Sequence, residues 1–342
     1  MKNNRLSSIP IAVLAASAII AGTASAEELP QTKAHQRFSV TQGFGAASLA
    51  MLQRVSAMGQ SEVSAALIQK LRPADVHQSA KVGGTLRTTG DQWSLEISSD
   101  GTAAEYHDLA VEARAHALGR PSSDQMPAAE VEQRGRTFIE SQLADQIALG
   151  ADEELVALRA DYRTEGGQDL TTGKVSRAVV ASRIVFGRVR GGVPVVGNGS
   201  KVILTFINDG SLESFRYDWP TYEAGATQNV ADVGEVLSRV QKAMMVRSGV
   251  AALAPGAAVP VIGGREYPVA LTPNTHLQAL ECGYYDPGFF ARKSRSVQPG
   301  CTYLAVSQDA SGTRQGYAGA APAAASSASD ADWLETQILG GQ

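Results

Sequence analysis

The sequence is poor in the residues that build metal sites and nucleophilic sites. It has two cysteines and five histidines among 342 residues, and no two histidines stand three to five positions apart. His107 and His116 are nine residues apart, too far to share one helix face of a zinc site. No His-Glu-x-x-His, Gly-x-Ser-x-Gly, Walker or dinucleotide-binding glycine motif occurs. We therefore predict no metal, no cofactor and no enzymatic activity.

Charge and aromatic residues are also scarce. Charged residues make up 19% of the chain and aromatic residues 6%, while apolar residues reach 44%. That apolar share supports a sizeable core and excludes disorder of the whole chain. Beyond the N-terminus, no apolar run approaches the ~20 residues of a membrane span. Because the chain is acidic overall, with a formal net charge of -4, we expect neither nucleic acid nor an anionic membrane surface as its partner.

The first 26 residues have the pattern of a secretory signal peptide. Lys2 and Arg5 precede an apolar run over residues 9–21, and Ala24-Ser25-Ala26 offers small residues for signal peptidase. The alternative is an N-terminal membrane anchor, but the apolar run is short for one. We predict cleavage near Ala26 and a secreted or periplasmic protein. Losing the two basic residues takes the net charge from -4 to -6.

The two cysteines, Cys282 and Cys301, both follow the signal peptide. In an oxidising compartment such a pair predicts a disulfide bond, with two free thiols as the alternative. The enclosed segment is rich in aromatic and basic residues, a combination that suits protein recognition. Alternatively, its aromatic residues pack under the loop and its basic residues are only solvated. The candidate binding residues are Tyr284, Tyr285, Phe289, Phe290, Arg292, Lys293 and Arg295.

Hydrophobic periodicity predicts alternating helices and strands along the exported part. Apolar spacings of three to five residues predict helices at 48–71 (broken near Gly59), 128–149 and 232–247. Alternating apolar residues and turn dipeptides predict strands, many of them joined in hairpins. These strands are 93–98, 104–109, 179–189, 202–207, 212–217, 277–285 and 302–307.

Two of the predicted hairpins resemble each other. The run from Trp93 reaches Asp100-Gly101 after seven residues, and the run from Val202 reaches Asp209-Gly210 after the same interval. An aromatic residue, Tyr106 or Phe215, follows each turn. The pair is explained either by an internal duplication or by chance, since Asp-Gly is favoured in tight hairpin turns.

The segment from Arg183 to Leu212 contains a recognisable pattern: a strand with an arginine, Gly-x-Pro-Val-x-Gly, a second strand and Asp-Gly. This pattern resembles the PepSY-like segments of thermolysin-family propeptides and of related exported proteins that lack a peptidase domain. The matching positions are Arg188, Gly192, Pro194, Val195, Gly197, Asp209 and Gly210. The resemblance extends from Leu155 to about Tyr222 and implies a helix packed on an antiparallel sheet. No zinc-peptidase sequence follows it, so the resemblance implies binding to a separate partner.

The predicted fold class is α+β, with antiparallel sheets and packed helices arranged as two PepSY-like (cystatin-like) helix-on-sheet modules. We predict a signal peptide (1–26), an N-terminal α+β module (27–125), a PepSY-like α+β module with the disulfide-closed loop (126–317) and a flexible Ala/Ser-rich tail (318–342).

The predicted function is that of an exported non-catalytic binding protein, such as a protease inhibitor or a propeptide-like chaperone. Its expected partner is another protein, with a secreted protease as the narrower hypothesis. Two alternatives stay open: an envelope-associated structural or regulatory module, and an enzyme of unrecognised type whose catalytic groups come from distant residues.

Overall fold

Strands dominate the part of the chain that the structure describes. The structure is a computed structural model that describes residues 48–55, 58–71, 73, 75–168, 171–173, 175–248, 261–262, 265–266, 269–272, 275–292, 295–308, 314–324 and 337–339. The predicted signal peptide lies outside these residues. No helix within the described ranges has the length and apolar character needed to cross a bilayer.

Eighteen strands and four α-helices occur in the described residues. The strands are β1 (Ser48–Val55), β2 (Gln78–Val82), β3 (Thr85–Thr89), β4 (Trp93–Ile97), β5 (Ala103–Asp108), β6 (Glu153–Gln168), β7 (Val175–Arg190), β8 (Val193–Val196), β9 (Lys201–Ile207), β10 (Leu212–Asp218), β11 (Thr221–Asn229), β12 (Val261–Ile262), β13 (Arg265–Glu266), β14 (Val269–Thr272), β15 (Thr275–Tyr285), β16 (Ser296–Gln308), β17 (Arg314–Pro322) and β18 (Gln337–Leu339). The α-helices are α1 (Gln60–Leu71), α2 (Leu109–Ala115), α3 (Ala128–Phe138) and α4 (Val233–Ser248). A π-helical turn, η3 (Ile139–Leu143), continues α3, and a short 3₁₀ turn, η4 (Phe289–Ala291), follows β15.

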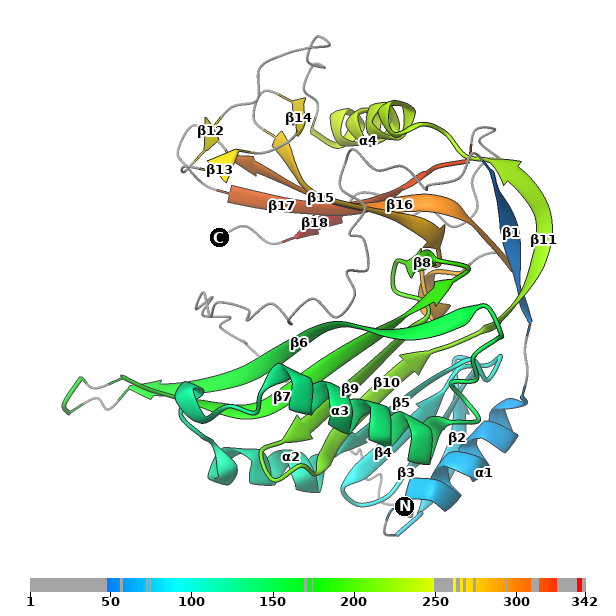
Figure 1. The fold of residues 1–342 in the computed structure, drawn as a ribbon. Coiled ribbons are helices and arrows are strands. Elements are labelled where there is room, and N and C mark those ends of the chain that lie inside the picture. The colour runs from blue at the N-terminus through cyan, green and yellow to red at the C-terminus, as the bar shows by residue number, and fades with distance from the viewer. Residues whose placement is uncertain are drawn as a thin grey trace, which may run out of the picture.

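Sixteen of these strands join into one large mixed sheet, which curls through the whole described molecule (Figure 1). Its pairing is antiparallel except where β15 runs parallel to β8. The predicted α+β class with two helix-on-sheet modules is therefore wrong: the described chain is mostly β, with four short α-helices on one continuous sheet. Local periodicity predicts strands but not which strands pair across the molecule, so the sequence could not reveal this continuity.

The lower half of the sheet in Figure 1 has the strand order β6-β7-β9-β10-β5-β4-β3-β2. Helices α1 and α3 contribute to a common apolar cluster with one face of these strands, and α2 packs against the other face. Side-chain alternation explains this arrangement, since Val202, Leu204 and Phe206 on β9 are buried in the cluster with both helices. Strand β4 contributes Trp93 and Leu95 to the same cluster.

The two hairpins that resemble each other in sequence are β4–β5 and β9–β10. They lie side by side because β5 pairs antiparallel with β10. Phe215 stands directly opposite Tyr106 in this pairing, and the two ring centroids are 5.6 Å apart. The two hairpins thus meet along their second strands, at the centre of the lower half of the sheet.

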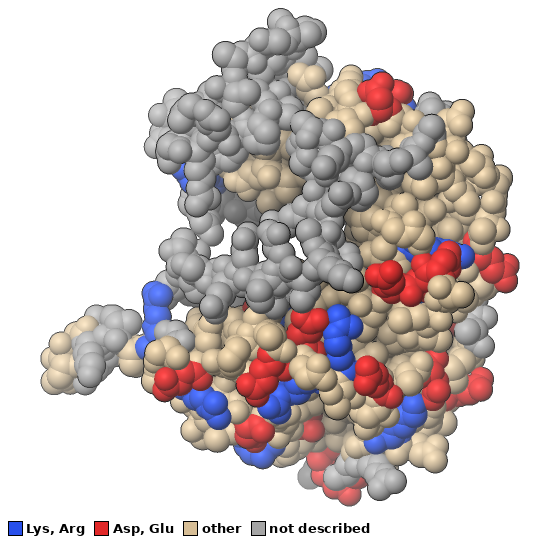
Figure 2. Space-filling model, in the orientation of Figure 1, with Lys and Arg blue, Asp and Glu red and all other residues tan. Residues whose placement is uncertain are grey.

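The upper half of the sheet contains β14 to β18, with α4 packed on one face (Figure 1). Cys282 on β15 lies opposite Cys301 on β16, and the two form a disulfide, which confirms the predicted bond. Both cysteines are buried in the apolar cluster under α4, with Val236, Val240 and other residues. In the view of Figure 2, charged side chains gather over the lower half of the molecule, and few are visible on the coloured part of the upper half.

Residues 48–55 form strand β1 rather than the first part of a helix. Leu49 and Leu52 suit a helical spacing, but β1 pairs with β11 and β16, which buries Leu52 to 1% exposure. This long-range pairing overrides the local pattern. The helix begins only at Gln60, after Gly59.

Strand pairing also crosses the predicted module boundary at residue 125. Strand β5 pairs with β10, and β1 pairs with β11 and β16. The predicted Ala/Ser-rich tail begins inside β17, whose residues pair with β16 along the strand. Its segment 325–336 lies outside the described residues.

Candidate functional site

The predicted binding residues fall into a buried group and an exposed group. Tyr284 and Tyr285 are buried at the end of β15. Phe290 is 77% exposed and Phe289 is half-buried, both on the turn η4. The predicted set is completed by Arg292, whose side chain is 8% exposed, by Arg295, which is exposed, and by Lys293, which lies outside the described residues.

The segment Asp286–Arg292, which we call the anchored loop, is held by a buried carboxylate. Asp286 is 0% exposed. Arg54 on β1 donates to both of its oxygens, at 3.3 and 3.1 Å, and the hydroxyl of Tyr222 on β11 donates to Oδ2 at 2.5 Å. The backbone N–H of Gly288 donates to Oδ1 at 3.0 Å. One side chain therefore ties the loop to two strands that are distant in sequence.

Arg292 closes the other end of the anchored loop. Its guanidinium donates to Oδ1 and Oδ2 of Asp286, each at 3.2 Å, and to Oδ1 of Asp218 on β10. It also donates to the hydroxyl of Thr102 at 3.1 Å. Asp218 in turn accepts the backbone N–H of Phe289 at 2.6 Å. The position of the two phenylalanines is thus set by buried hydrogen bonds and ion pairs.

Glycines make room for this arrangement. A Cβ on Gly199 would lie 2.1 Å from Cγ of Asp286, and a Cβ on Gly197 would lie 2.3 Å from the Asp286 carbonyl oxygen. Gly197 also has a φ of +91°, a region that favours glycine. The backbone of Gly199 donates to that carbonyl oxygen at 2.9 Å. The segment Gly197-Asn198-Gly199 therefore lets the backbone approach Asp286 closely.

Burial and neighbouring charges shift the acidity of the two carboxyl groups in opposite directions. Burial alone would raise the pKa of Asp286, but Arg292 and Arg54 hold that pKa well below its usual range. Burial, together with the negative charge of Asp286, raises the pKa of Asp218 to about 6, although Arg292 opposes the shift. The four groups are two anions and two cations, so the cluster is electrically balanced when both carboxyls are ionised.

Two more cations surround the cluster. Burial lowers the pKa of Lys201 to about 8, and its ammonium donates to the carbonyl oxygens of Val195 and Gly199 at 2.8 and 3.2 Å. Arg188, one of the positions that match the PepSY-like pattern, lies over the Trp219 ring at 4.0 Å and donates to the Pro220 carbonyl at 2.8 Å. The contacts of Arg188 hold Trp219 and Pro220, the two residues that connect β10 to β11.

The buried cluster positions the loop. Asp286, Asp218 and Arg54 are all buried. Arg54 donates to Asp286, and Arg292 donates to both carboxylates. The large apolar side chain that the anchored loop exposes to solvent is Phe290, with Phe289 packed edge-on against it at a centroid distance of 5.2 Å. The arrangement can therefore present an aromatic side chain in a fixed position.

Local sequence signals could not find most of this site. Phe289, Phe290 and Arg292 were predicted because they lie in the cysteine-closed segment, but Arg54, Asp218 and Asp286, which fasten the loop, were not. Arg54 and Asp286 are 232 positions apart, and Asp218 and Arg292 are 74 apart. Single aspartates and arginines carry no periodicity, so their convergence follows from strand pairing alone.

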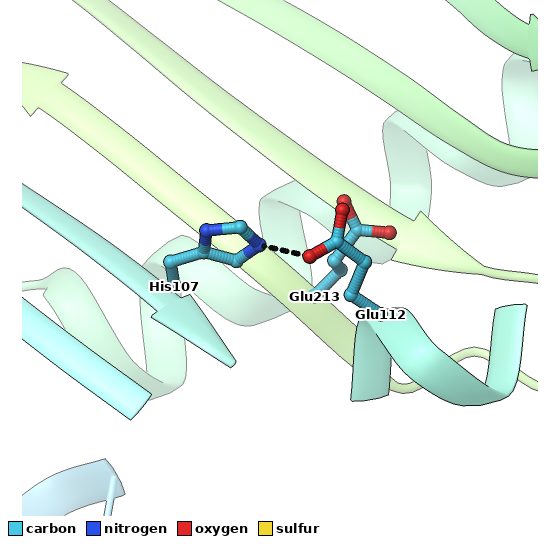
Figure 3. Close-up of side chains that lie close together, drawn as sticks. All are labelled: His107, Glu112 and Glu213. Carbon is cyan, nitrogen blue, oxygen red and sulfur yellow. Dashed lines mark ion pairs between the residues drawn. The ribbon is translucent and has the colours of Figure 1, made fainter. Parts of the chain in front are cut away.

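A second group of titratable side chains lies beside α2, away from the anchored loop. His107, Glu112 and Glu213 bring their ligand atoms within 4.8 Å of one another, and His107 lies 3.1 Å from Glu112 (Figure 3). However, both oxygens of Glu213 accept from Arg163, at 2.7 and 2.8 Å. A guanidinium in this position satisfies the carboxylate and opposes a cation. We therefore do not assign a metal site here.

The raised pKa of Asp218 leads to a pH-dependent prediction. A carboxyl with a higher pKa in the folded state holds a proton there that the unfolded chain has released, so its contribution to stability falls as pH rises from about 4 to about 6. Replacement of Asp218 by asparagine should remove this part of the pH dependence. Urea unfolding of both proteins at pH 4, 5, 6 and 7 measures it. A constant difference in unfolding free energy across this range would contradict the prediction.

The comparisons with known proteins add no relative. No protein-family model matches the chain, and no curated protein matches it significantly. The geometry of the anchored loop is therefore the evidence for its role.

Proposed function

We propose that the protein is an exported binding protein that contacts a partner protein through the anchored loop, with Phe290 as the central contact. The main support for this proposal is the contrast in solvent exposure between neighbouring residues of one short segment. Phe290 is 77% exposed, while the residues that flank it on the loop are tied down by buried ion pairs. Large aromatic side chains in fixed positions are typical centres of protein interfaces.

Pre-ordering explains why such a loop would favour binding. A flexible loop loses conformational entropy when it binds, at about 0.5–1.5 kcal/mol for each immobilised side chain, and a loop already held in place avoids part of this loss. Burying charged groups contributes little to stability compared with apolar packing. The free-energy cost of burying these charged groups is therefore better explained by a need to orient the loop than by a need to stabilise the fold.

The surface around Phe290 mixes apolar and charged groups. The Arg216 guanidinium lies 5.8 Å from the Phe290 ring centroid, and Glu96 and Glu105 line the same shallow depression. A protein interface commonly has an aromatic centre and a polar rim of this kind. Export is part of the proposal and is supported by the signal-peptide pattern and by the disulfide. The non-catalytic role is also part of the proposal and rests on the missing catalytic motifs. The secreted-protease partner rests on the PepSY-like resemblance.

Site-specific photocrosslinking tests the proposed contact. A photoreactive amino acid at position 290 should crosslink to a defined partner among the exported proteins of the source organism, and one at Leu158, which is 43% exposed on β6, should not. Against the partner so identified, Phe290→Asp should weaken binding by at least about 30-fold, the effect of losing a hot-spot residue. Leu158→Asp is the matched control and should leave the affinity unchanged.

Two results would overturn the proposal. One is equal crosslinking from positions 290 and 158. The other is an unchanged affinity of the Phe290→Asp protein for the partner. If the crosslinked partner is a protease, an assay of its activity with the wild-type protein and with Phe290→Asp decides whether the contact inhibits it.

A further inference from the structure

The turn between β8 and β9 contains a serine with an unusual backbone conformation. Ser200 has a φ of +52°, and among the described residues Asp75 is the other non-glycine residue with a positive φ. Residues that have a Cβ seldom adopt this conformation. For an L residue, a positive φ turns the side chain toward the carbonyl carbon of the preceding residue, whereas the usual negative φ turns it away. The Ser200 side chain therefore leaves Cα on the same side as the Gly199 carbonyl carbon.

The hydroxyl of Ser200 is oriented by a buried chain of hydrogen bonds. Ser200 is 0% exposed, and its Oγ lies 2.8 Å from the hydroxyl oxygen of Tyr222. Tyr222 gives its single hydroxyl proton to Asp286, so Ser200 is the donor toward Tyr222. A hydroxyl that donates its proton in this way keeps its lone pairs available. The Ser200 oxygen can therefore act as a nucleophile toward a neighbouring carbon.

The carbonyl group of Gly199 is polarised by a buried cation. The Lys201 ammonium donates to the Gly199 carbonyl oxygen at 3.2 Å. Burial lowers the pKa of Lys201 to about 8, so the ammonium is still charged at neutral pH. A cation on a carbonyl oxygen makes the carbon more electrophilic and stabilises the oxyanion that forms when a nucleophile attacks. The backbone N–H of Gly199 donates to the Asp286 carbonyl at 2.9 Å, so Gly199 is held on both sides.

A second Gly-Ser bond in the chain provides an internal comparison. Gly210 and Ser211 also lie at a hairpin turn, between β9 and β10. Ser211 does not have a positive φ, and it is half-buried where Ser200 is fully buried. The unusual conformation and burial of Ser200 thus do not follow from the Gly-Ser dipeptide itself.

We propose that the Gly199–Ser200 peptide bond cleaves itself, with Ser200 as the nucleophile and Lys201 as the oxyanion-stabilising group. Oγ of Ser200 attacks the Gly199 carbonyl carbon, the C–N bond breaks, and the hydroxyl proton ends on the Ser200 nitrogen. The product is an ester between Gly199 and Ser200 Oγ. Water then hydrolyses the ester to a Gly199 carboxylate and returns a proton to Oγ. Asn198, directly before Gly199, is exposed, so solvent lies close to this bond.

Strand pairing would keep the two cleaved fragments together. The first fragment holds β1 to β8 and the second holds β9 to β18 (Figure 1). Strands of the two fragments pair at β7 with β9, at β5 with β10, at β1 with β11 and β16, and at β8 with β15. The disulfide joins Cys282 to Cys301 within the second fragment. The cleaved protein should therefore behave as one particle when folded, and its fragments should separate in denaturant even without reductant.

The test follows the full exported chain after purification. The protein is incubated at pH 7.5 over several days, denatured at intervals, and analysed by mass spectrometry and N-terminal sequencing. We expect two fragments whose masses add up to that of the intact chain plus one water. The second fragment should begin at Ser200. The Gly210–Ser211 bond in the same molecule should stay intact.

Variants separate the chemistry from an effect on folding. Ser200→Ala should abolish cleavage, and Ser200→Cys, which restores a nucleophile of similar size, should retain it. Lys201→Met should slow cleavage at least about 100-fold, the effect of removing an oxyanion donor. Lys81→Met, at an exposed position on β2, is the matched control and should cleave at the wild-type rate. Circular dichroism of each variant checks that it is folded.

The cleavage occurs once in each chain and is independent of the proposed partner contact, so the Phe290→Asp protein should cleave as the wild type does. Four results would overturn the proposal. The wild-type chain stays intact, or Ser200→Ala cleaves as fast as the wild type. Lys201→Met cleaves at the wild-type rate. The second fragment begins at Gly199, which would indicate cleavage through the side chain of Asn198 instead.

Discussion

Replacement of Asp286 by alanine is expected to lower the free energy of unfolding by about 3–5 kcal/mol, because it leaves Arg54 and Arg292 buried without their shared counter-charge. Urea unfolding at pH 7, followed by far-UV circular dichroism, measures the change. Asp161→Ala is the matched control. Asp161 pairs with Arg183 at 2.7 Å on the surface, where such pairs contribute about 0–1 kcal/mol.

A double variant separates the loss of a partner from the loss of packing. If uncompensated charge is the main cost of Asp286→Ala, adding Arg292→Met should recover part of the lost stability, since residues in one network do not act additively. Equal costs for Asp286→Ala and Asp161→Ala would contradict the role of the buried cluster. So would a double variant whose loss is the sum of the two single losses.

Removal of the disulfide is expected to cost about 3 kcal/mol of unfolding free energy. The bond joins residues 19 positions apart, and closing a loop of this size restricts the unfolded chain by about that amount. The comparison is urea unfolding of the wild-type protein with and without reductant, beside Cys282→Ala/Cys301→Ala. Reductant should destabilise only the wild-type protein. If it shifts neither protein, the bond does not form in solution, and the oxidising-compartment prediction loses its main support.

The buried ionic cluster links these expectations to the proposed binding role. Ion pairs inside a protein gain little net stability over apolar packing, but breaking one is costly. A loop held in this way has one strongly preferred position, and its exposed ring stays where a partner would meet it. The Asp286→Ala protein should therefore also lose affinity for the partner that Phe290 contacts, even under conditions where it stays folded.

Much of the local structure could be predicted from residue patterns. Alternation between apolar and polar residues placed β4, β5, β9, β10 and β15 within two residues of their observed bounds, and the Asp-Gly turns marked two hairpins. It found β7 and β16 but placed their starts four and six residues too late. The helix α4 was predicted within a residue of its observed ends. Two lone cysteines in a chain with a signal-peptide pattern were enough to predict the disulfide. These features depend on neighbours in sequence or on composition, so no knowledge of the fold was needed.

The pairing of distant strands was beyond any local pattern. The apolar residues of 49–55 have a helical spacing, but this segment pairs with β11 and β16 as a strand. That pairing places Arg54 beside Asp286. Because β5 pairs with β10, the two hairpins belong to one sheet and not to two separate modules. The anchored loop is fastened by residues from β1, β10 and β11. Backbone hydrogen bonding between strands is nearly independent of side-chain identity, so the packing of the whole chain decides which strands pair. The anchored loop arises from that pairing.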